Sequence, residues 1–222
     1  MKRLILMAAS VILALSLAAP VAFAQPEQGS KAPKTAGGLA AAWWQWALSE
    51  PEATNPLIGS YAGGPKCDGQ PLTDTRADTW FLAGSTSTDP AVRTCTVPAG
   101  SQLFFPVVTT SWTFTDPETD TDKLAREAVQ GFMRSLLSDP EFSMTVTVDG
   151  KEVHRIVRGK SHFFDVQLQE GNLLGAPAGT YRALADGFWV TLRPLSEGEH
   201  TIHVVTTSSG FSQDITYHVT VE

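Results

Sequence analysis

The sequence predicts a mainly β fold, an antiparallel β-sandwich with two packed helices at about residues 38–49 and 121–138. Three observations support this class. After Phe142, apolar and polar residues alternate with a period of two in several segments, as half-buried strands require. Turn-forming residues separate these segments, and Asp149-Gly150 is the clearest hairpin signal. Two stretches show instead the longer period that is typical of a helix packed on one face.

The first predicted helix contains three tryptophans, Trp43, Trp44 and Trp46. Leu39, Trp43 and Trp46 recur at helical spacing and form one apolar stripe, which Trp44 widens on one side. Pro51 ends the helix, because the residue before a proline avoids the helical conformation. A sugar-binding platform or a membrane anchor would need exposed rings, whereas this stripe favours packing against a sheet. We therefore expect Trp43 and Trp46 in the core and Trp44 partly exposed.

Three short apolar runs, at 79–84, 93–100 and 102–108, predict the first strands. Pro106 lies in the third run and has no N–H to donate, so we expect an edge or a bulge there. Residues 50–75 are rich in Pro, Gly, Asn and Asp and predict a long loop before these strands. A loop of this length needs an attachment, which Cys67 supplies.

The second predicted helix, at 121–138, begins with a cap and a cluster of acids. The side chain of Thr121 suits the N-cap position, and acids near a helix start interact favourably with the helix dipole. A period of four predicts that the core face is formed by Leu124, Ala128, Phe132 and Leu136, with Val129, Met133 and Leu137 beside it.

The remaining strands are predicted as a hairpin at 142–158, strands at 161–168 and 187–195, and a closing hairpin at 200–221. In the closing hairpin, we pair Val204 with Tyr217, which places both apolar sets on one face. The same register places His203 opposite His218 on the outer face.

The N-terminus predicts export. Two basic residues precede an apolar run, and Ala22 and Ala24 are the small residues that a signal peptidase reads. We expect a signal peptide over 1–24, a flexible leader over 25–38 and a single β-sandwich-like domain over 39–222, in the periplasm or outside the cell. The run is too short for a convincing membrane span, and we expect none in the mature protein.

The charge of the chain argues against nucleic acid as a partner. The formal net charge is −7, and removing residues 1–24 takes away two basic residues and no acid, which leaves −9. Nucleic-acid binding depends on clustered Lys and Arg, so an acidic exported domain is a poor candidate for it.

The chain has two cysteines, Cys67 and Cys95. In an oxidising compartment they are expected to form a disulfide. The bond would close a loop of about 28 residues, for which chain entropy gives roughly 3–4 kcal/mol. The alternatives, a catalytic thiol or a metal-binding pair, have less support because no base or further ligand is evident.

Several segments form a recognisable pattern. They are WWQWALSEPEATNPL, the Cys67 segment with Gly69-Gln70, WFLAG, RTCTVPAG and LFFPVV, followed by VTVDGKEV, NLLGAPAGTY, DGFWVTLRPLSEGEHTIHV and ITYHVTV. Together they resemble a family of small secreted bacterial proteins of uncharacterised function, over about residues 39–221. The insertion PLTDTRADT before WFLAG departs from that pattern. The resemblance implies export, the disulfide and one compact unit, and it carries over no catalytic residue.

Two tryptophans are the candidate ligand-binding residues: Trp112, which follows a predicted strand, and Trp44. We expect no cofactor and no metal, although two sets of residues have suitable spacing. One is the pair His203 and His218, which lacks a further ligand. The other is the acidic run of Asp116, Glu118, Asp120 and Asp122, in which Thr121 stands where a calcium loop needs glycine.

No catalytic residue is evident. The sequence contains no G-x-S-x-G elbow, and Asp165 alternates with apolar neighbours as a solvent-facing strand residue does. We therefore expect a non-enzymatic binding module for an extracellular or envelope ligand, for example a polysaccharide. The alternative is an extracellular hydrolase whose carboxylate or histidine site assembles only in the folded chain.

Overall fold

The structure, a computed structural model, describes residues 35–58 and 79–222. It confirms a mainly β fold with two helices and two packed sheets. The helices are α1 (Ala36–Leu48) and α2 (Asp122–Ser138), with a short 3-10 helix at Glu52–Thr54. The strands are β1 (Thr79–Phe81), β2 (Ala91–Val97), β3 (Gln102–Thr113), β4 (Ser143–Val148), β5 (Lys151–Glu152), β6 (Val157–Lys160), β7 (Phe164–Leu168), β8 (Gly179–Leu192), β9 (Gly198–Ser208) and β10 (Phe211–Val221).

Both sheets are mixed, which corrects the expectation of purely antiparallel pairing. The first sheet has the order β1-β3-β8-β6, with β7 also paired to β8, and the second has the order β2-β10-β9-β4-β5. Two pairs are parallel, β1 with β3 and β2 with β10. The chain leaves β1, forms β2 in the second sheet and returns as β3 to the first. Such a crossover is what a parallel pair requires.

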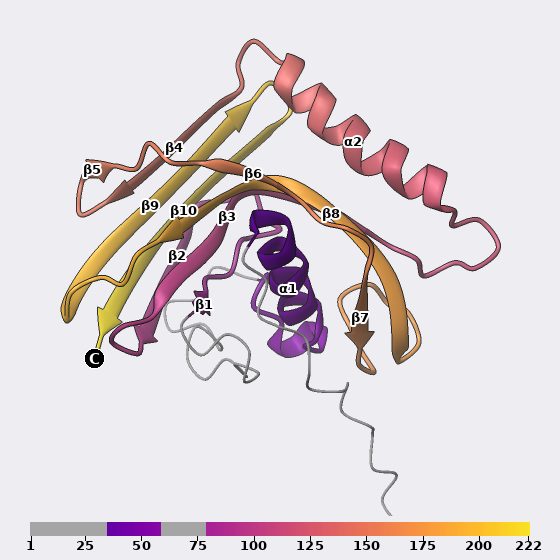
Figure 1. Cartoon of the computed structure of the whole chain (residues 1–222), viewed down its shortest axis with the longest axis horizontal. Helices are drawn as coiled ribbons and strands as arrows, with labels where there is room; N and C mark the ends of the chain where they lie inside the picture. The colour runs from indigo at the N-terminus through magenta and orange to yellow at the C-terminus, as the bar shows by residue number, and fades with distance from the viewer. Residues whose placement is uncertain (1–34, 59–78) are drawn as a thin grey trace, which may run out of the picture.

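The first sheet is curved, and α1 lies on its concave side, below the arch of β3 and β8 (Figure 1). The Thr35 side chain caps this helix by accepting a hydrogen bond from the Gly38 N–H. The start of α1 touches the main chain of β6, where a Cβ added to Gly159 would lie 2.8 Å from the Ala36 carbonyl oxygen. Glycine at this position is what permits the close approach.

The tryptophan helix is part of the core, as predicted. Trp43 and Trp46 are buried and pack with aromatic rings of the first sheet, while Trp44 is partly exposed. Within that sheet, the rings of Phe104 and Trp189 are stacked with centroids 5.0 Å apart. The planes of Trp43 and Trp44 are nearly perpendicular, at 88°. Rings held in this way do not form a flat platform.

The second sheet and α2 lie on the other side of the first sheet (Figure 1). The core between the sheets is formed by residues from both, including Leu103, Phe105, Val190, Ile202, Ile215 and Tyr217. The expected irregularity at Pro106 is confirmed as a register shift between Pro106 and Val108. The buried hydroxyl of Thr206 donates to the Val107 carbonyl at 2.9 Å, so a carbonyl at the bulge is paired across the two sheets.

The second helix begins where predicted, and Thr121 accepts a hydrogen bond from the Leu124 N–H. Its core face was predicted only in part: Leu136 is buried as predicted, but Leu124 and Phe132 are not. The buried residues are Ala125, Val129, Met133 and Leu136, whereas Leu124 and Phe132 are 38% and 39% exposed. Two neighbouring apolar stripes compete on this helix, and contact with β3 and β8 buries only one of them.

The closing hairpin forms with a different register. Val204 pairs with Ile215 and Tyr217 pairs with Ile202, around a turn at Ser209 and Gly210. The shift is by two residues, so both apolar sets still share one face. His203 therefore lies opposite Thr216 rather than His218.

Candidate functional site

Four consecutive carbonyl groups after β1 each accept a hydrogen bond from a side chain. The segment 82–85 carries these carbonyls. Their donors are Trp43 Nε1 to Leu82 O at 2.8 Å, Tyr217 Oη to Ala83 O at 2.7 Å, an Arg93 Nη to Gly84 O at 2.6 Å and Gln213 Nε2 to Ser85 O at 2.7 Å. We call this arrangement the carbonyl clamp. It holds an irregular segment in one conformation, because buried carbonyls are costly to leave unpaired.

The clamp is assembled by strand pairing. Arg93 of β2 and Tyr217 of β10 are partners in the parallel register, so both side chains point toward the first sheet. Burial lowers the pKa of Arg93, and burial raises the pKa of Tyr217. Over the neutral range the phenol therefore keeps the proton that it donates to Ala83.

The clamped segment forms one side of a groove with a volume of about 320 Å³, within the size range of small-ligand sites. The groove runs between α1 and α2 and along residues 106–110 of β3, and we call it the α1–α2 groove. It is lined by Trp43, Trp44, Leu57, Gly84, Ser85, Thr86, Pro106, Val108, Thr109, Thr110, Phe132, Phe211 and Gln213. The lining is mainly apolar, and its polar side chains are all uncharged.

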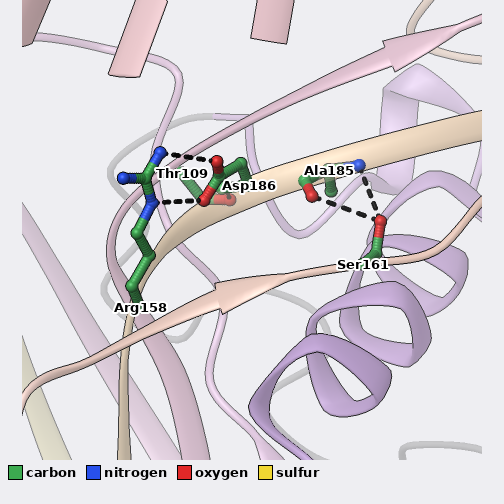
Figure 2. Close-up of polar contacts among 5 residues, drawn as sticks. All are labelled: Thr109, Arg158, Ser161, Ala185 and Asp186. Atoms are coloured by element: carbon green, nitrogen blue, oxygen red, sulfur yellow. Dashed lines mark hydrogen bonds and ion pairs between the residues drawn. The ribbon is translucent and has the colours of Figure 1, made fainter. Parts of the chain in front are cut away.

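The position of Trp44 at the groove is set by hydrogen bonds through β3 into β8. Trp44 Nε1 donates to Thr109 Oγ1 at 3.2 Å, and the Thr109 hydroxyl donates to the Asp186 carbonyl at 3.1 Å. Figure 2 shows the carboxylate of Asp186 held by two hydrogen bonds from Arg158, at 3.0 and 2.7 Å. The hydrogen bond to Asp186 raises the pKa of Arg158.

The same part of β8 is joined to the chain before β7. The Ser161 hydroxyl donates to the Ala185 carbonyl at 3.2 Å and accepts from the Ala185 N–H at 2.9 Å (Figure 2). Hydroxyl and ion-pair contacts at Ala185 and Asp186 thus hold the part of β8 that supports Trp44. A ligand-binding side chain with this support needs little reorganisation on binding.

Of the two predicted ligand-binding tryptophans, the groove contains Trp44 but not Trp112. Trp112 is partly buried, and its Nε1 donates to Asp120 Oδ1 at 2.9 Å. This contact ties the end of β3 to the loop before α2. Trp112, one of the two candidate ligand-binding residues, therefore has a structural contact at this position.

The acidic run is used mainly in local hydrogen bonds. Asp120 also accepts from the Asp116 N–H, while Asp116 accepts from the Glu118 N–H and the Thr119 hydroxyl. These bonds lower the pKa of Asp116, and the Thr119 hydroxyl has the largest effect. Among the described residues, no three His, Cys, Asp or Glu side chains gather in a way that would hold a metal ion.

The histidines of the closing hairpin also lie apart from each other. His203 Nε2 lies 2.8 Å from Asp214 Oδ1, while His218 is exposed opposite Thr201. The predicted cross-strand pair is therefore not formed. His203 is thus paired with a carboxylate rather than with a second imidazole.

One cluster has the composition of a catalytic triad. His200 Nδ1 lies 2.8 Å from Asp149 Oδ2, and His200 Nε2 lies 3.2 Å from Ser196 Oγ and 2.9 Å from the Ser196 carbonyl oxygen. Carboxylate and carbonyl oxygens only accept, so these two contacts are both hydrogen bonds when both ring nitrogens carry hydrogen. The hydrogen bonds to Asp149 and to the Ser196 carbonyl raise the pKa of His200. A cationic ring cannot take a proton from serine, as a triad requires.

The predicted disulfide falls partly outside the described residues, because Cys67 belongs to the stretch 59–78. Cys95 lies on β2 and is 1% exposed, within the core between the sheets. The predicted signal peptide and most of the predicted leader, at 1–34, also lie outside the described residues. No helix among the residues that are described has the length and apolar character to cross a membrane.

Comparison with known proteins identifies no family and no relative. No family model matches the chain, and no curated protein matches it. A solved structure of PbICP-C in complex with falcipain-2 is similar over 65% of this chain and 99% of its own, with 9% identity and a TM-score of 0.27. The solution structure of Amebosin covers 60% of this chain and 96% of its own, with 13% identity and a TM-score of 0.20. Scores this low support no statement about function.

Sequence reasoning missed most of the groove. Phe132 was expected in the core, and Arg93, Gln213 and Tyr217 were read only as strand residues. One signal was available for Arg93, a charged residue that lies two positions from both Ala91 and Cys95 and therefore shares their buried face of β2. A charge at an inward position needs a partner, and here the partner is a carbonyl of the segment 82–85.

Proposed function

We propose that this protein is an exported binding module that holds an extracellular or envelope ligand in the α1–α2 groove. The observation that carries the proposal is the combination of the carbonyl clamp with the uncharged groove beside it. Four buried or partly buried donors fix the segment that carries Gly84 and Ser85. Such preorganisation favours recognition, because little conformational entropy is lost on binding.

The composition of the groove supports binding rather than chemistry. Among the described residues, the lining includes no carboxylate, imidazole, thiol or amine. Its hydroxyl groups therefore have no base beside them, which proton transfer or nucleophilic attack would require. Trp44, Phe132 and Phe211 supply apolar contact area, and Thr110 and Gln213 supply polar atoms. A ligand that fits this lining is uncharged and partly apolar.

The test compares two variants of α2. Phe132→Ser removes a groove side chain, whereas Leu137→Ser removes a side chain that is exposed to a similar degree, 49% against 39%, but lies outside the groove. Purified mature protein is incubated with cell-envelope fractions and with insoluble polysaccharides, and the retained protein is measured. We expect retention of wild type and Leu137→Ser on at least one material and loss of Phe132→Ser. Equal behaviour of the two variants, or no retention on any material, would overturn the proposal.

Export is part of the proposal and is tested separately. When the full chain is expressed in a bacterial host, the exported protein should begin at Gln25. N-terminal sequencing of the protein outside the cytoplasm gives the result directly. Accumulation in the cytoplasm with residues 1–24 attached would contradict it.

A hydrolase is the second candidate, because His200 lies within hydrogen-bonding distance of both Ser196 and Asp149. The contact of His200 Nε2 with the Ser196 carbonyl argues against it, because a ring nitrogen makes this hydrogen bond only as a donor. A fluorophosphonate probe reacts only with activated serines, so we expect no labelling of Ser196 at pH 7. Labelling that disappears in His200→Gln would favour the hydrolase instead.

A further inference from the structure

The occupant of the groove follows from the free edge of β3. β8 pairs with β3 on one side from Leu103 to Thr113, whereas β1 pairs on the other side only from Gln102 to Phe104. Among the described residues, the last main-chain hydrogen bond on that side joins the Leu82 N–H to the Phe104 carbonyl at 3.1 Å. In the described part of the chain, no strand pairs with this side beyond Phe104. We call residues 108–113 on this side the β3 edge, because Pro106 has no N–H and the Val107 carbonyl is already bonded to Thr206.

The β3 edge has the chemistry of a strand acceptor. Along a strand, main-chain N–H and C=O groups point to both sides, so the side without a partner presents donors and acceptors in a row. Natural proteins usually protect such edges with charged side chains. Here residues 109–113 read TTSWT and carry no charge. The edge is therefore open to pairing with another chain.

The groove places apolar side chains above and below this edge. Trp44 of α1 lies on one face of the first sheet, and Phe132 of α2 lies on the other, and both line the groove with Thr109 and Thr110. Side chains of an added strand alternate between the two faces. Successive residues of such a strand would thus meet Trp44 and Phe132 in turn.

We infer that the groove binds an extended, uncharged polypeptide segment that joins the first sheet as a strand beside β3. This inference rests on the proposed function and names its ligand. Strand addition of this kind takes affinity from main-chain hydrogen bonds and specificity from alternate side chains. The uncharged lining selects against acidic and basic segments, because a charge buried there would have no partner.

The tryptophans fit a peptide better than a sugar. Sugar stacking requires an accessible ring face, but Trp43 is buried and meets Trp44 edge to face. The indole N–H groups of both rings are already bonded, to Leu82 and to Thr109. Trp44 therefore offers an apolar side wall more readily than a stacking platform.

The test uses a library of acetylated and amidated octapeptides without charged residues, and binding is measured by fluorescence polarisation. For the best binder, two versions are made with N-methyl groups at the odd or at the even positions. Only one set of N–H groups faces β3, so we expect one version to lose about tenfold or more in affinity and the other to lose little. Equal loss in both versions, or no binder in the whole library, would overturn the inference.

A second experiment separates this inference from the proposed function. Envelope material that retains the protein is treated with a broad-specificity protease or with glycan hydrolases before the assay. Loss of retention with protease only, together with weaker octapeptide binding by Phe132→Ser and unchanged binding by Leu137→Ser, is the expected result. Loss of retention with glycan hydrolases only would leave the binding module intact but refute a peptide occupant.

Discussion

The carbonyl clamp predicts the effect of removing a single oxygen atom. In Tyr217→Phe, the ring stays in a fully buried site, but the donor to the Ala83 carbonyl, 2.7 Å away, is lost. Ala83 is itself buried, so water does not readily replace the donor. A buried acceptor left without its partner costs about 1–3 kcal/mol. We expect Tyr217→Phe to lose about 2 kcal/mol of unfolding free energy, the middle of that range.

The assay is urea unfolding of the mature protein at pH 7, followed by tryptophan fluorescence. The midpoint should fall without a change in the m value, because the surface exposed on unfolding is nearly the same. For a domain of this size, the loss corresponds to about 4–8 °C in Tm. The matched control is Tyr181→Phe, whose hydroxyl donates to the Pro177 carbonyl at 2.8 Å in an exposed setting.

We expect Tyr181→Phe to change the unfolding free energy by less than about 0.5 kcal/mol. Similar losses in both variants would refute the reasoning, since burial of the acceptor would then not determine the cost. Tyr217→Phe should also weaken retention on the envelope ligand, because Gly84 and Ser85 line the groove. Full retention would show that the clamp does not organise the groove.

Three further predictions follow from other parts of the structure. Arg158→Met should cost about 3–5 kcal/mol in urea unfolding, because it leaves the buried carboxylate of Asp186 without its cation; a loss below about 1 kcal/mol, as for a surface pair, would contradict this. Gly131→Ala should raise the unfolding free energy by roughly 0.5–1 kcal/mol, since Gly131 lies inside α2 with open space around a new Cβ. A decrease in the unfolding free energy would contradict this. The hydrogen bonds to Asp149 and to the Ser196 carbonyl raise the pKa of His200 in the folded state. The contribution of the charged imidazole to the unfolding free energy is therefore complete below the ordinary histidine pKa of 6.5, and it is lost as the pH rises through the raised pKa. The stability of wild type relative to His200→Gln, measured from pH 5 to 9, should therefore fall with pH, and a flat difference would exclude the charged pair.

The helices show which structural features a local sequence pattern can predict. Thr121 was correctly assigned as a cap, because capping depends on residues within one turn. The core face of α2 was not assigned correctly at Leu124 and Phe132, because these residues form an apolar stripe as regular as that of Ala125 and Val129. Which stripe is buried depends on where the helix lies against β3 and β8, and that position cannot be predicted from the helix sequence alone.

The closing hairpin and the parallel pairs show the same limit for strands. Alternation predicted correctly that Val204 and Tyr217 face the core, since every register that shifts by two preserves the face. The register itself is set by the turn at Ser209 and Gly210. The parallel pairing of β2 with β10 depends on contacts between strands more than a hundred residues apart in the chain, for which no local period exists.

The sequence by itself determined the two helices, the β-rich class, the bulge at Pro106 and the burial of Trp43 and Trp46, because each of these depends on spacing within one element. Only the tertiary structure decided that donors from α1, β2 and β10 meet at the segment 82–85, and that Trp44 and Phe132 flank an open edge of β3. The physical reason is that hydrogen bonds and apolar contacts act between atoms that are close in space, and the distances among these elements exist only after the two sheets have packed.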